Sequence, residues 1–262
     1  MDRHELKPRS LREVLGLVDS WITAVAAAIR QDDARPPARP DDLPAPTRCI
    51  RIVSCNLARH NPSVGATLER LLATRADLLL LQEVTGPHLC AVAERMQIGW
   101  TVVAHPRRDF HGVALLTRTP VLDSGISLVA GTSAAWVDLP LPPGTPRVRV
   151  VCVHAPAPIA PGPWRCWKEF FAAVEQMMRN RTSPIIVAGD FNATVRHADL
   201  ARLLDVAGAA GSHLRAGPTW PARRPLLEVD HVIHTPELRC EFAARLVVSG
   251  SDHLALVADF GR

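Results

Sequence analysis

A chain of 262 residues, of which 47% are hydrophobic and 21% charged, is able to bury a sizeable core, which excludes a disordered or fibrous protein. Its formal net charge of +4 is carried almost entirely by arginine, because Lys7 and Lys168 are the only lysines. Arginine grips phosphate with a planar fork of donors, so the charge favours an anionic partner, although a GC-rich coding background produces the same arginine bias.

The first element predicted along the chain is an amphipathic helix, within an extension at residues 1–31. Apolar side chains recur at helical spacing in residues 11–30. The same stretch carries Arg12, Glu13 and Asp19, which is too much charge for a transmembrane segment. We expect its apolar face to dock on the following domain, to bind a partner or to pair with a second copy, and the sequence leaves these three alternatives open.

A catalytic domain is predicted at residues 49–262, after a linker at residues 32–48 that is dense in proline and in charge of both signs. Its expected elements are a strand at 49–56, a helix at 64–75, strands at 76–84, 111–118 and 148–155, a helix at 163–181, a strand at 184–192, a helix at 197–208, and strands at 228–234, 242–250 and 254–260. Helices mixed with buried and hairpin-type strands predict an α/β domain with mixed sheets.

The cysteines favour a reduced protein. Cys55 and Cys152 lie in apolar, strand-like runs, where a thiol behaves as a small hydrophobic group. No hydrophobic signal stretch opens the sequence. The absence of any CxxC pair argues against a zinc site among the six cysteines, Cys49, Cys55, Cys90, Cys152, Cys166 and Cys240. We therefore expect a cytoplasmic location.

Polar side chains stand at or near the ends of four predicted strands, and two acid–histidine pairs follow them. The strand-end residues are Asn56, Glu83, His154 and Asp190, and the pairs are Asp230-His231 and Asp252-His253. Each one alone has an ordinary explanation, such as capping the next turn. Together they suggest a site, because an acid in an apolar run is costly unless it is paired or binds a metal. Carboxylate and amide oxygens favour Mg²⁺, Mn²⁺ or Ca²⁺ over zinc.

Asp190 and Asn192 belong to the stretch "GDFN" and are two residues apart. If the extended conformation persists, both side chains point to the same side of the sheet. A carboxylate and an amide on one face can hold a water nucleophile between them. The carboxylate would accept the proton of the water, and the amide would donate to a phosphate oxygen.

The ordered motifs "SCN", "LQEV", "HGVALLTR", "VCVHA", "GDFNA", "TWP", "VDHV" and "SDHLAL" resemble those of the endonuclease/exonuclease/phosphatase superfamily, the metal-dependent phosphoesterases related to pancreatic-type deoxyribonuclease. The resemblance runs from about residue 50 to residue 262. It implies an α/β fold, an α+β four-layer sandwich of two facing mixed β-sheets flanked by helices, with the site at one edge. It also implies in-line attack of water on a phosphate ester, with Mg²⁺ as cofactor and Mn²⁺ as a substitute.

The resemblance assigns roles to residues that match its motifs. Glu83 is similar to the principal metal ligand of the family, with Asn56 and Asp252 near the metal or its waters. Asp190 and Asn192 resemble the pair that orients the nucleophilic water and contacts the phosphate. These five residues are therefore the expected metal and nucleophile groups.

Two histidines complete the implied set. His253, polarised by Asp230, resembles the histidine that binds the scissile phosphate or shuttles a proton, and His154 resembles the second phosphate-binding or leaving-group histidine. His111 lies near the place of the acid that supports the second histidine in secreted deoxyribonucleases. Ala58 replaces an acid typical of the abasic-site endonucleases, and the chain contains no tyrosine, so abasic-site repair is not expected.

A nuclease is the first of three functions considered. Arg107 and Arg108 precede "HGVALLTR", and Arg223 and Arg224 follow "TWP". With the family geometry, both loops lie near the catalytic edge, where these arginines either contact a phosphate backbone or remain solvated surface residues. We therefore expect a phosphate-ester substrate, with nucleic acid favoured over lipid or a small molecule.

The second function is a phosphodiesterase or phosphatase acting on a lipid head group or a small phosphate ester. Trp164 and Trp167 would touch a membrane or an apolar substrate in that case, or else staple the start of the adjacent helix. A non-enzymatic binding module is the third, and it is disfavoured because every polar position of the motifs is retained.

Overall fold

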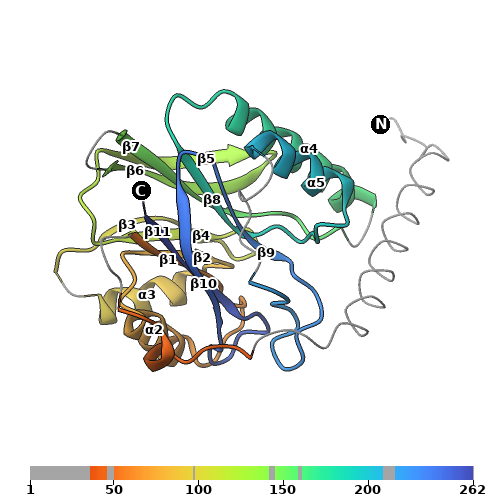
Figure 1. Cartoon of the computed structure of the whole chain (residues 1–262). Helices are drawn as coiled ribbons and strands as arrows, with labels where there is room; N and C mark the ends of the chain where they lie inside the picture. The colour runs from red at the N-terminus through yellow and green to blue at the C-terminus, as the bar shows by residue number, and fades with distance from the viewer. Residues whose placement is uncertain are drawn as a thin grey trace.

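The computed structural model of the chain describes residues 36–45, 50–96, 98–141, 145–158, 161–208 and 216–261. The amphipathic helix predicted within residues 1–31 lies outside these ranges. In the described part, two β-sheets pack face to face, and a pair of helices covers the outer face of each sheet (Figure 1). This layered arrangement confirms the predicted fold class.

The first sheet has six strands in the order β10-β11-β1-β2-β4-β3. Their bounds are β1 (Ile50–Asn56), β2 (Leu78–Gln82), β3 (Thr101–His105), β4 (Val113–Thr117), β10 (Arg239–Leu246) and β11 (Ala255–Gly261). β1 and β2 are parallel, whereas β11 pairs with β1 in the antiparallel sense. The C-terminal ends of β1 and β2 and the N-terminal end of β11 therefore meet at one edge.

The second sheet has five strands in the order β5-β6-β7-β8-β9. Their bounds are β5 (Asp123–Val129), β6 (Thr132–Leu141), β7 (Thr145–His154), β8 (Ile185–Asp190) and β9 (Asp230–His234). β7 and β8 are parallel with His154 opposite Asp190, and β9 runs antiparallel to β8 with Asp230 opposite Asp190. Three of the predicted site residues thus lie side by side at one edge of this sheet.

Helices α2 and α3 pack on the first sheet, and α4 and α5 pack on the second (Figure 1). Their bounds are α2 (Val64–Ala73), α3 (Gly86–Arg95), α4 (Pro161–Arg179) and α5 (Ala198–Ala207), and a short 3-10 helix, η1 (Pro40–Asp42), precedes β1. The buried side chains of α4 recur every three or four residues, which gives the helix one apolar face. They include Trp167, Phe170, Phe171, Val174 and Met178.

The strands bury side chains on both of their faces. In β2, Leu78 and Leu80 pack into the layer between the two sheets, while Leu79 and Leu81 pack under α2 and α3. Successive strand residues point to opposite faces, so each face of the sheet receives every second residue. This two-sided burial is why β2 reads as a continuous apolar run rather than as an alternating pattern.

Three strands and one helix were not among the predicted elements, namely β3, β5, β6 and α3. β3 and β5 are the outermost strands of their sheets, and most side chains of β5 are exposed. Such a strand is held by one neighbour only and lacks the apolar pattern of a buried strand. Helix α3 begins with Gly86 and Pro87 and buries only His88 and Val92, so its apolar period is faint.

The described part of the predicted linker, residues 36–45, is attached to the first sheet at two points. The backbone N–H of Ala38 donates to the carbonyl oxygen of Arg245 on β10 at 2.7 Å. The Nη2 of Arg51 donates to the carbonyl oxygen of Pro44, also at 2.7 Å. Arg51 is itself buried, and its guanidinium makes a bidentate ion pair with Asp259 of β11.

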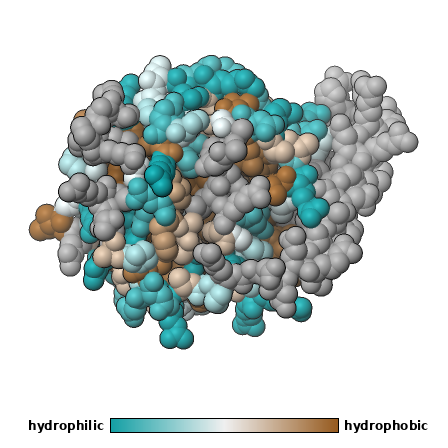
Figure 2. Space-filling model, in the orientation of Figure 1, coloured by the Kyte–Doolittle hydropathy of each residue, from teal (hydrophilic) through white to brown (hydrophobic). Residues whose placement is uncertain are grey.

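Figure 2 shows hydrophilic residues over the upper part of the visible face, where α4 lies in Figure 1, with apolar residues exposed below them. Scattered apolar exposure of this kind is normal for a folded domain. Across the residues that the structure describes, no helix has the length and apolar character that a bilayer crossing requires.

Five cysteines in the described ranges carry free thiols: Cys55, Cys90, Cys152, Cys166 and Cys240. Cys55 and Cys152 are buried in strands, and burial raises the pKa of both thiols above the ordinary value. A buried thiol that stays protonated behaves as a small hydrophobic group. This agrees with the interpretation of these two residues from the sequence.

Candidate active site

The polar ends of the two sheets meet at a single edge, and Asn56 joins them. Its Nδ2 donates to Oε1 of Glu83 at 3.2 Å and to Oδ2 of Asp190 at 3.1 Å. Its Oδ1 accepts a hydrogen bond from the backbone N–H of Ala58. Asn56 ends β1 and Glu83 follows β2, both of the first sheet, whereas Asp190 ends β8 of the second, so one buried amide connects carboxylates from both layers.

Glu83 follows β2 directly and is held in an unusual backbone conformation. Its φ of 56° lies in the left-handed region, which costs a non-glycine residue free energy and often marks a functional position. Its Oε2 accepts a hydrogen bond from the backbone N–H of Arg59 at 2.7 Å. The carboxylate is half-buried and is fixed on the first sheet by one side-chain donor and one backbone donor.

The extended conformation expected through Asp190 and Asn192 does not persist, because β8 ends at Asp190. Asn192 has a φ of 48°, and its backbone N–H turns back to donate to Oδ1 of Asp190 at 2.8 Å. Its side-chain Nδ2 donates to the carbonyl oxygen of Ala155 at 2.9 Å. Gly189 has a φ of 153°, and a Cβ there would collide with the carbonyl oxygen of Val153. A tight turn, rather than strand alternation, therefore fixes the pair.

His154 and His253 each direct their Nε2 toward Asp190. The Nδ1 of His154 lies 2.7 Å from the carbonyl oxygen of Phe110, which only accepts, so Nδ1 carries the hydrogen. Its Nε2 lies 3.5 Å from Oδ2 of Asp190. The Nδ1 of His253 lies 2.9 Å from Oδ2 of Asp230, and its Nε2 lies 3.8 Å from Oδ2 of Asp190. The predicted partnership of His253 with Asp230 is thus present.

Burial and mutual charge set the ionisation of this group. Burial disfavours a charged His253, but the carboxylates of Asp230 and Asp190 outweigh it and raise its pKa to about 10. Burial also disfavours a charged His154, but the carboxylate of Asp190 outweighs it and raises the pKa of His154. Burial also disfavours the charge on Asp190, yet His253 and His154 lower its pKa. Burial raises the pKa of Asp230. Asp190 is therefore an ionised carboxylate between two imidazole donors.

The "TWP" motif supports both acid–histidine pairs, a role that the sequence did not reveal although the motif itself was visible. The Oγ1 of Thr219 accepts from the backbone N–H groups of Val229 and Asp230, each at 3.4 Å. The Nε1 of Trp220 donates to Oδ2 of Asp252 at 3.0 Å. Asp252 itself is exposed, so this bond is what orients its carboxylate.

Ser251 is a second supporting residue that the sequence did not reveal. Its Oγ donates to the carbonyl oxygen of Asn56 at 2.7 Å and accepts from the backbone N–H of His253 at 3.0 Å. One hydroxyl therefore links the end of β1 to the segment that carries Asp252 and His253. Ser251 opens the motif "SDHLAL", but only the fold shows which groups its hydroxyl joins.

His231 does not belong to this group. It follows Asp230 in β9, and neighbouring strand residues point to opposite faces. Its Nε2 lies 2.7 Å from the carbonyl oxygen of Ala193, and its ring packs edge-on against Phe191. Burial lowers the pKa of His231 to about 4, so its ring is neutral in the folded protein.

The predicted substrate-binding residues differ in availability. Arg107 is engaged by Asp109, with its Nε 2.8 Å from Oδ1 and its Nη2 2.6 Å from Oδ2, and this pairing holds the pKa of Asp109 well below its usual range. Arg107 therefore braces its own loop through an ion pair that is open to solvent. The ring of His111 lies 6.2 Å from that of His154. All four predicted arginines are exposed, and the structure gives Arg107 a carboxylate partner, Asp109.

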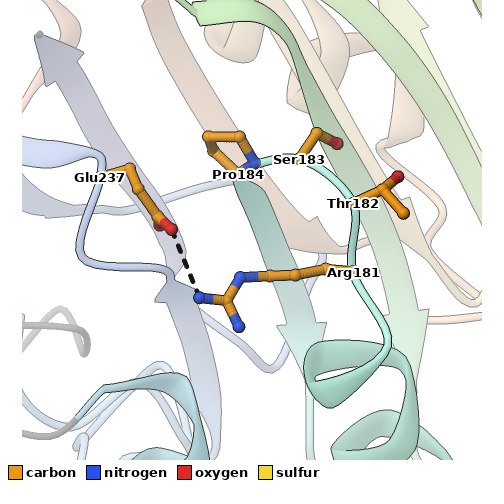
Figure 3. A pocket seen from close by; sticks show the side chains of 5 residues that line it. All are labelled: Arg181, Thr182, Ser183, Pro184 and Glu237. Atoms are coloured by element: carbon orange, nitrogen blue, oxygen red, sulfur yellow. Dashed lines mark hydrogen bonds and ion pairs between the residues drawn. The ribbon is translucent and has the colours of Figure 1, made fainter.

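A cavity of about 410 Å³ lies elsewhere, lined by Arg181, Thr182, Ser183, Pro184 and Glu237. Figure 3 shows Arg181 and Glu237 facing one another across it, with 3.3 Å between Nη2 and Oε1. The cavity precedes β8, whereas Asp190 ends that strand, so it lies at the opposite edge of the second sheet. Its lining contains an ion pair and small polar groups but none of the clustered histidines and acids.

Two sets of side chains offer metal-binding atoms. Within the described ranges, Asp190, Asp230 and His253 each present a ligand atom within 4.8 Å of the others. These three are already paired with one another, and a histidine with a raised pKa repels a cation. Oxygen donors of the kind that Mg²⁺ prefers come from the predicted set, Asn56, Glu83 and Asp252.

Comparisons with known proteins agree with this architecture. The model of the Endonuclease/Exonuclease/phosphatase family matches residues 53–253. A search of curated proteins gave no match. Among solved structures, D. rerio TDP2 complexed with single strand DNA product is 14% identical and has a TM-score of 0.65, over 82% of this chain and 100% of that one.

Two further solved structures are similar in fold. A mannosyl-6-phosphatase of Bacteroides thetaiotaomicron VPI-5482 is 16% identical, with a TM-score of 0.62 over 81% of this chain and 100% of that one. The human Nocturnin catalytic domain is 20% identical, with a TM-score of 0.59 over 86% of this chain and 96% of that one. At these identities the likeness establishes the fold alone.

Proposed function

The chain belongs to the Endonuclease/Exonuclease/phosphatase family, and from that premise we propose that it is a divalent-metal-dependent nuclease. Membership makes it a phosphoric ester hydrolase. The finer assignment is that water attacks a phosphodiester bond of DNA or RNA in line with the leaving oxygen. The observation that carries it is the single edge at which Glu83, Asp190 and His253 come together through hydrogen bonds and close ion pairs.

The donor set suits a hard divalent cation. Glu83 and Asp252 offer carboxylate oxygens, and Oδ1 of Asn56, which accepts one hydrogen bond from the N–H of Ala58, keeps a second lone pair. No cysteine of the described ranges joins them. We propose that these three residues hold Mg²⁺, with Mn²⁺ as a substitute. When bound, such an ion offsets negative charge on the phosphoryl oxygens.

Asp190 and Asn192 are proposed to position the nucleophile. Asp190 is buried and ionised, and its Oδ1 is fixed by the backbone of Asn192, which leaves its carboxylate ready to accept a proton from water as the new P–O bond forms. A side-chain amide has two N–H donors. One N–H of the Asn192 side chain donates to the carbonyl oxygen of Ala155, so the second N–H is assigned to a phosphate oxygen.

His253 and His154 are proposed to act on the negative charge of the phosphate. Both turn Nε2 toward the centre of the site. The pKa of His253, about 10, makes it a protonated donor at neutral pH, and the carboxylate of Asp190 raises the pKa of His154, which favours its protonated form. One donor stabilises the non-bridging oxygens, and the other passes its proton to the leaving oxygen. Asp230 keeps His253 oriented and charged through the bond to Nδ1.

The choice of nucleic acid over lipid rests on surface chemistry. Arg108, Arg223 and Arg224 are exposed on loops that flank the site motifs, and exposed arginines fit a phosphate backbone. Trp164 and Trp167, which a lipid-directed enzyme would present outward, are 8% and 0% exposed. Trp167 donates to the carbonyl oxygen of Phe191. These two tryptophans form part of the core, which removes the feature that favoured a membrane or apolar substrate.

A small phosphate ester remains the alternative, because the relatives include a mannosyl-6-phosphatase beside a TDP2 structure that holds single-strand DNA product. Purified protein with Mg²⁺ is tested against plasmid DNA, single-stranded oligonucleotides and a panel of sugar and lipid-head-group phosphates. We expect cleavage of the nucleic acids and its complete loss in EDTA. Activity confined to the small esters would contradict the nuclease assignment but not the phosphoesterase one.

A further inference from the structure

The ring of Phe110 stands in solvent beside the candidate active site. Its side chain is 52% exposed, although phenylalanine is usually buried. Its own carbonyl oxygen accepts the hydrogen bond from Nδ1 of His154. The backbone that carries the ring is therefore bonded to a residue of the catalytic edge, which fixes the ring close to the point where a phosphate is proposed to bind.

Arg59 packs on this ring. The centre of its guanidinium lies 4.9 Å from the ring centroid, within the range of a cation–π contact. The backbone N–H of the same residue donates to Oε2 of Glu83. The Arg59–Phe110 pair is thus attached at one end to the proposed metal ligand and at the other to His154.

The loop that carries Phe110 is braced on both sides of the ring. Asp109 accepts from the side chain of Arg107 and from the backbone N–H of His111 at 3.0 Å. The backbone N–H of Val84 donates to the carbonyl oxygen of Gly112, and the N–H of Arg107 donates to the carbonyl oxygen of Val84, each at 3.0 Å. A Cβ at Gly112 would collide with the carbonyl oxygen of Val84. The exposed ring is therefore presented from a fixed backbone and does not belong to a loose surface turn.

We propose that Phe110 and Arg59 form a stacking subsite for one unpaired nucleobase next to the scissile phosphate, so that the preferred substrate is single-stranded nucleic acid. This inference rests on the proposed nuclease function. Every base has a π-face that stacks on an aromatic ring, but in a duplex that face is already covered by its neighbours. A guanidinium beside the ring adds a cation for the backbone phosphate of the same nucleotide.

A lipid surface fits these surroundings less well. A ring that enters a bilayer interface is accompanied by other apolar side chains. The neighbours of Phe110 in sequence and space are instead ionic: Arg59 on its face, the Arg107–Asp109 ion pair, and the exposed Arg108. A single aromatic group among charges matches a nucleotide, which is itself a ring attached to a phosphate.

The test compares two single-stranded oligonucleotides of equal length, one with normal bases and one in which every base is replaced by an abasic tetrahydrofuran unit. Phe110→Leu removes the ring but keeps an apolar side chain and the carbonyl that binds His154. We expect it to raise KM for the normal oligonucleotide about 10-fold, the typical value of one base–aromatic stack, with kcat little changed. KM for the abasic oligonucleotide should not move, and Phe110→Trp should restore binding.

Leu122→Ala is the matched control, because Leu122 is 57% exposed and its backbone bonds to Asp138, far along β6 from the catalytic edge. An unchanged melting temperature for Phe110→Leu verifies the fold. Equal effects on both oligonucleotides, or none on either, would overturn the stacking subsite while leaving the nuclease assignment intact. Failure of the native protein to cleave either oligonucleotide would overturn both. Binding to phosphatidylserine vesicles that Phe110→Leu abolishes would overturn the subsite in favour of a lipid contact.

Discussion

The Nδ2 of Asn56 lies 3.1 Å from Oδ2 of Asp190, and this hydrogen bond joins two residues that are 134 positions apart and belong to different sheets. The same Nδ2 also donates to Glu83, so it separates and satisfies two carboxylates that would otherwise repel one another. The candidate site therefore depends on how the two sheets pack, and not only on the loops of either one.

Replacing Asn56 by Ala tests that dependence. The substitution leaves two carboxylates facing each other across the interface between the sheets without a shared donor, at a buried position. We expect a loss of about 1–3 kcal/mol in the free energy of unfolding, the usual cost of an unsatisfied buried polar group. Nuclease activity should fall more than stability alone explains. Urea unfolding and kcat measured on the folded protein separate the two effects, and wild-type values for both would contradict the bridging role.

Trp220→Phe isolates the support of Asp252. The ring is retained, but the Nε1 that donates to Oδ2 of Asp252 at 3.0 Å is lost. Outer partners of a metal ligand typically change metal affinity by about 10- to 100-fold. We expect the Mg²⁺ concentration for half-maximal activity to rise within that range, with kcat at saturating Mg²⁺ nearly preserved. An unchanged Mg²⁺ titration would mean that Asp252 does not bind the ion.

Arg51→Met probes the buried ion pair that fixes the first sheet. The Nε and Nη2 of Arg51 lie 2.7 Å and 2.6 Å from the two carboxylate oxygens of Asp259. Removing one partner of a buried pair leaves an uncompensated charge and costs about 3–5 kcal/mol. Adding Asp259→Leu should recover part of that loss in thermal unfolding. A single variant as stable as the native protein would show that the pair contributes nothing.

His231 gives a pH dependence of stability whose direction follows from its pKa. Burial lowers its pKa in the folded protein from 6.5 to about 4, so between these values the unfolded chain binds a proton that the folded one does not. Stability should fall as pH drops below about 6.5, by roughly 1.4 kcal/mol for each unit of pKa difference, and should not change on this account at higher pH.

The control for this effect is His231→Gln, which cannot titrate. Its unfolding free energy, measured by urea titration from pH 4.5 to pH 8, should show a shallower slope on the acid side than that of the native protein, because His88, His111 and His197 also have lowered pKa values and retain their share of the slope. A parallel slope in both proteins would assign the acid sensitivity to another group.

Much of the site could be predicted because strand ends are local features. An apolar run that stops at Asn56, Glu83, His154 or Asp190 is visible in one sequence, and parallel pairing then brings such ends to one edge. What could not be predicted depends on contacts between distant segments. Ser251 bonds to Asn56 only because β11 pairs with β1.

The errors have different causes. Asn192 was expected to continue an extended strand, but its backbone N–H finds an acceptor in Asp190 and the chain turns. Strand β5 escaped prediction because its exposed side chains carry no burial pattern. For Asn192 a short-range polar contact overrides the hydrophobic pattern, whereas β5 has no such pattern to detect.

The most direct test of the central claim is the turnover of Asp190→Asn on a single-stranded oligonucleotide at saturating Mg²⁺. Asparagine is nearly isosteric and still accepts the hydrogen bond from the N–H of Asn192, but it cannot take a proton from water. Its new amide nitrogen faces Nδ2 of Asn56, so the hydrogen bond between these two residues is lost and the melting temperature should fall. With Asp123→Asn, which replaces an exposed carboxylate on β5, as the control, we predict that kcat of the folded Asp190→Asn protein falls by about 10²–10⁴-fold. A folded Asp190→Asn protein with the native kcat would show that hydrolysis does not take place at this edge.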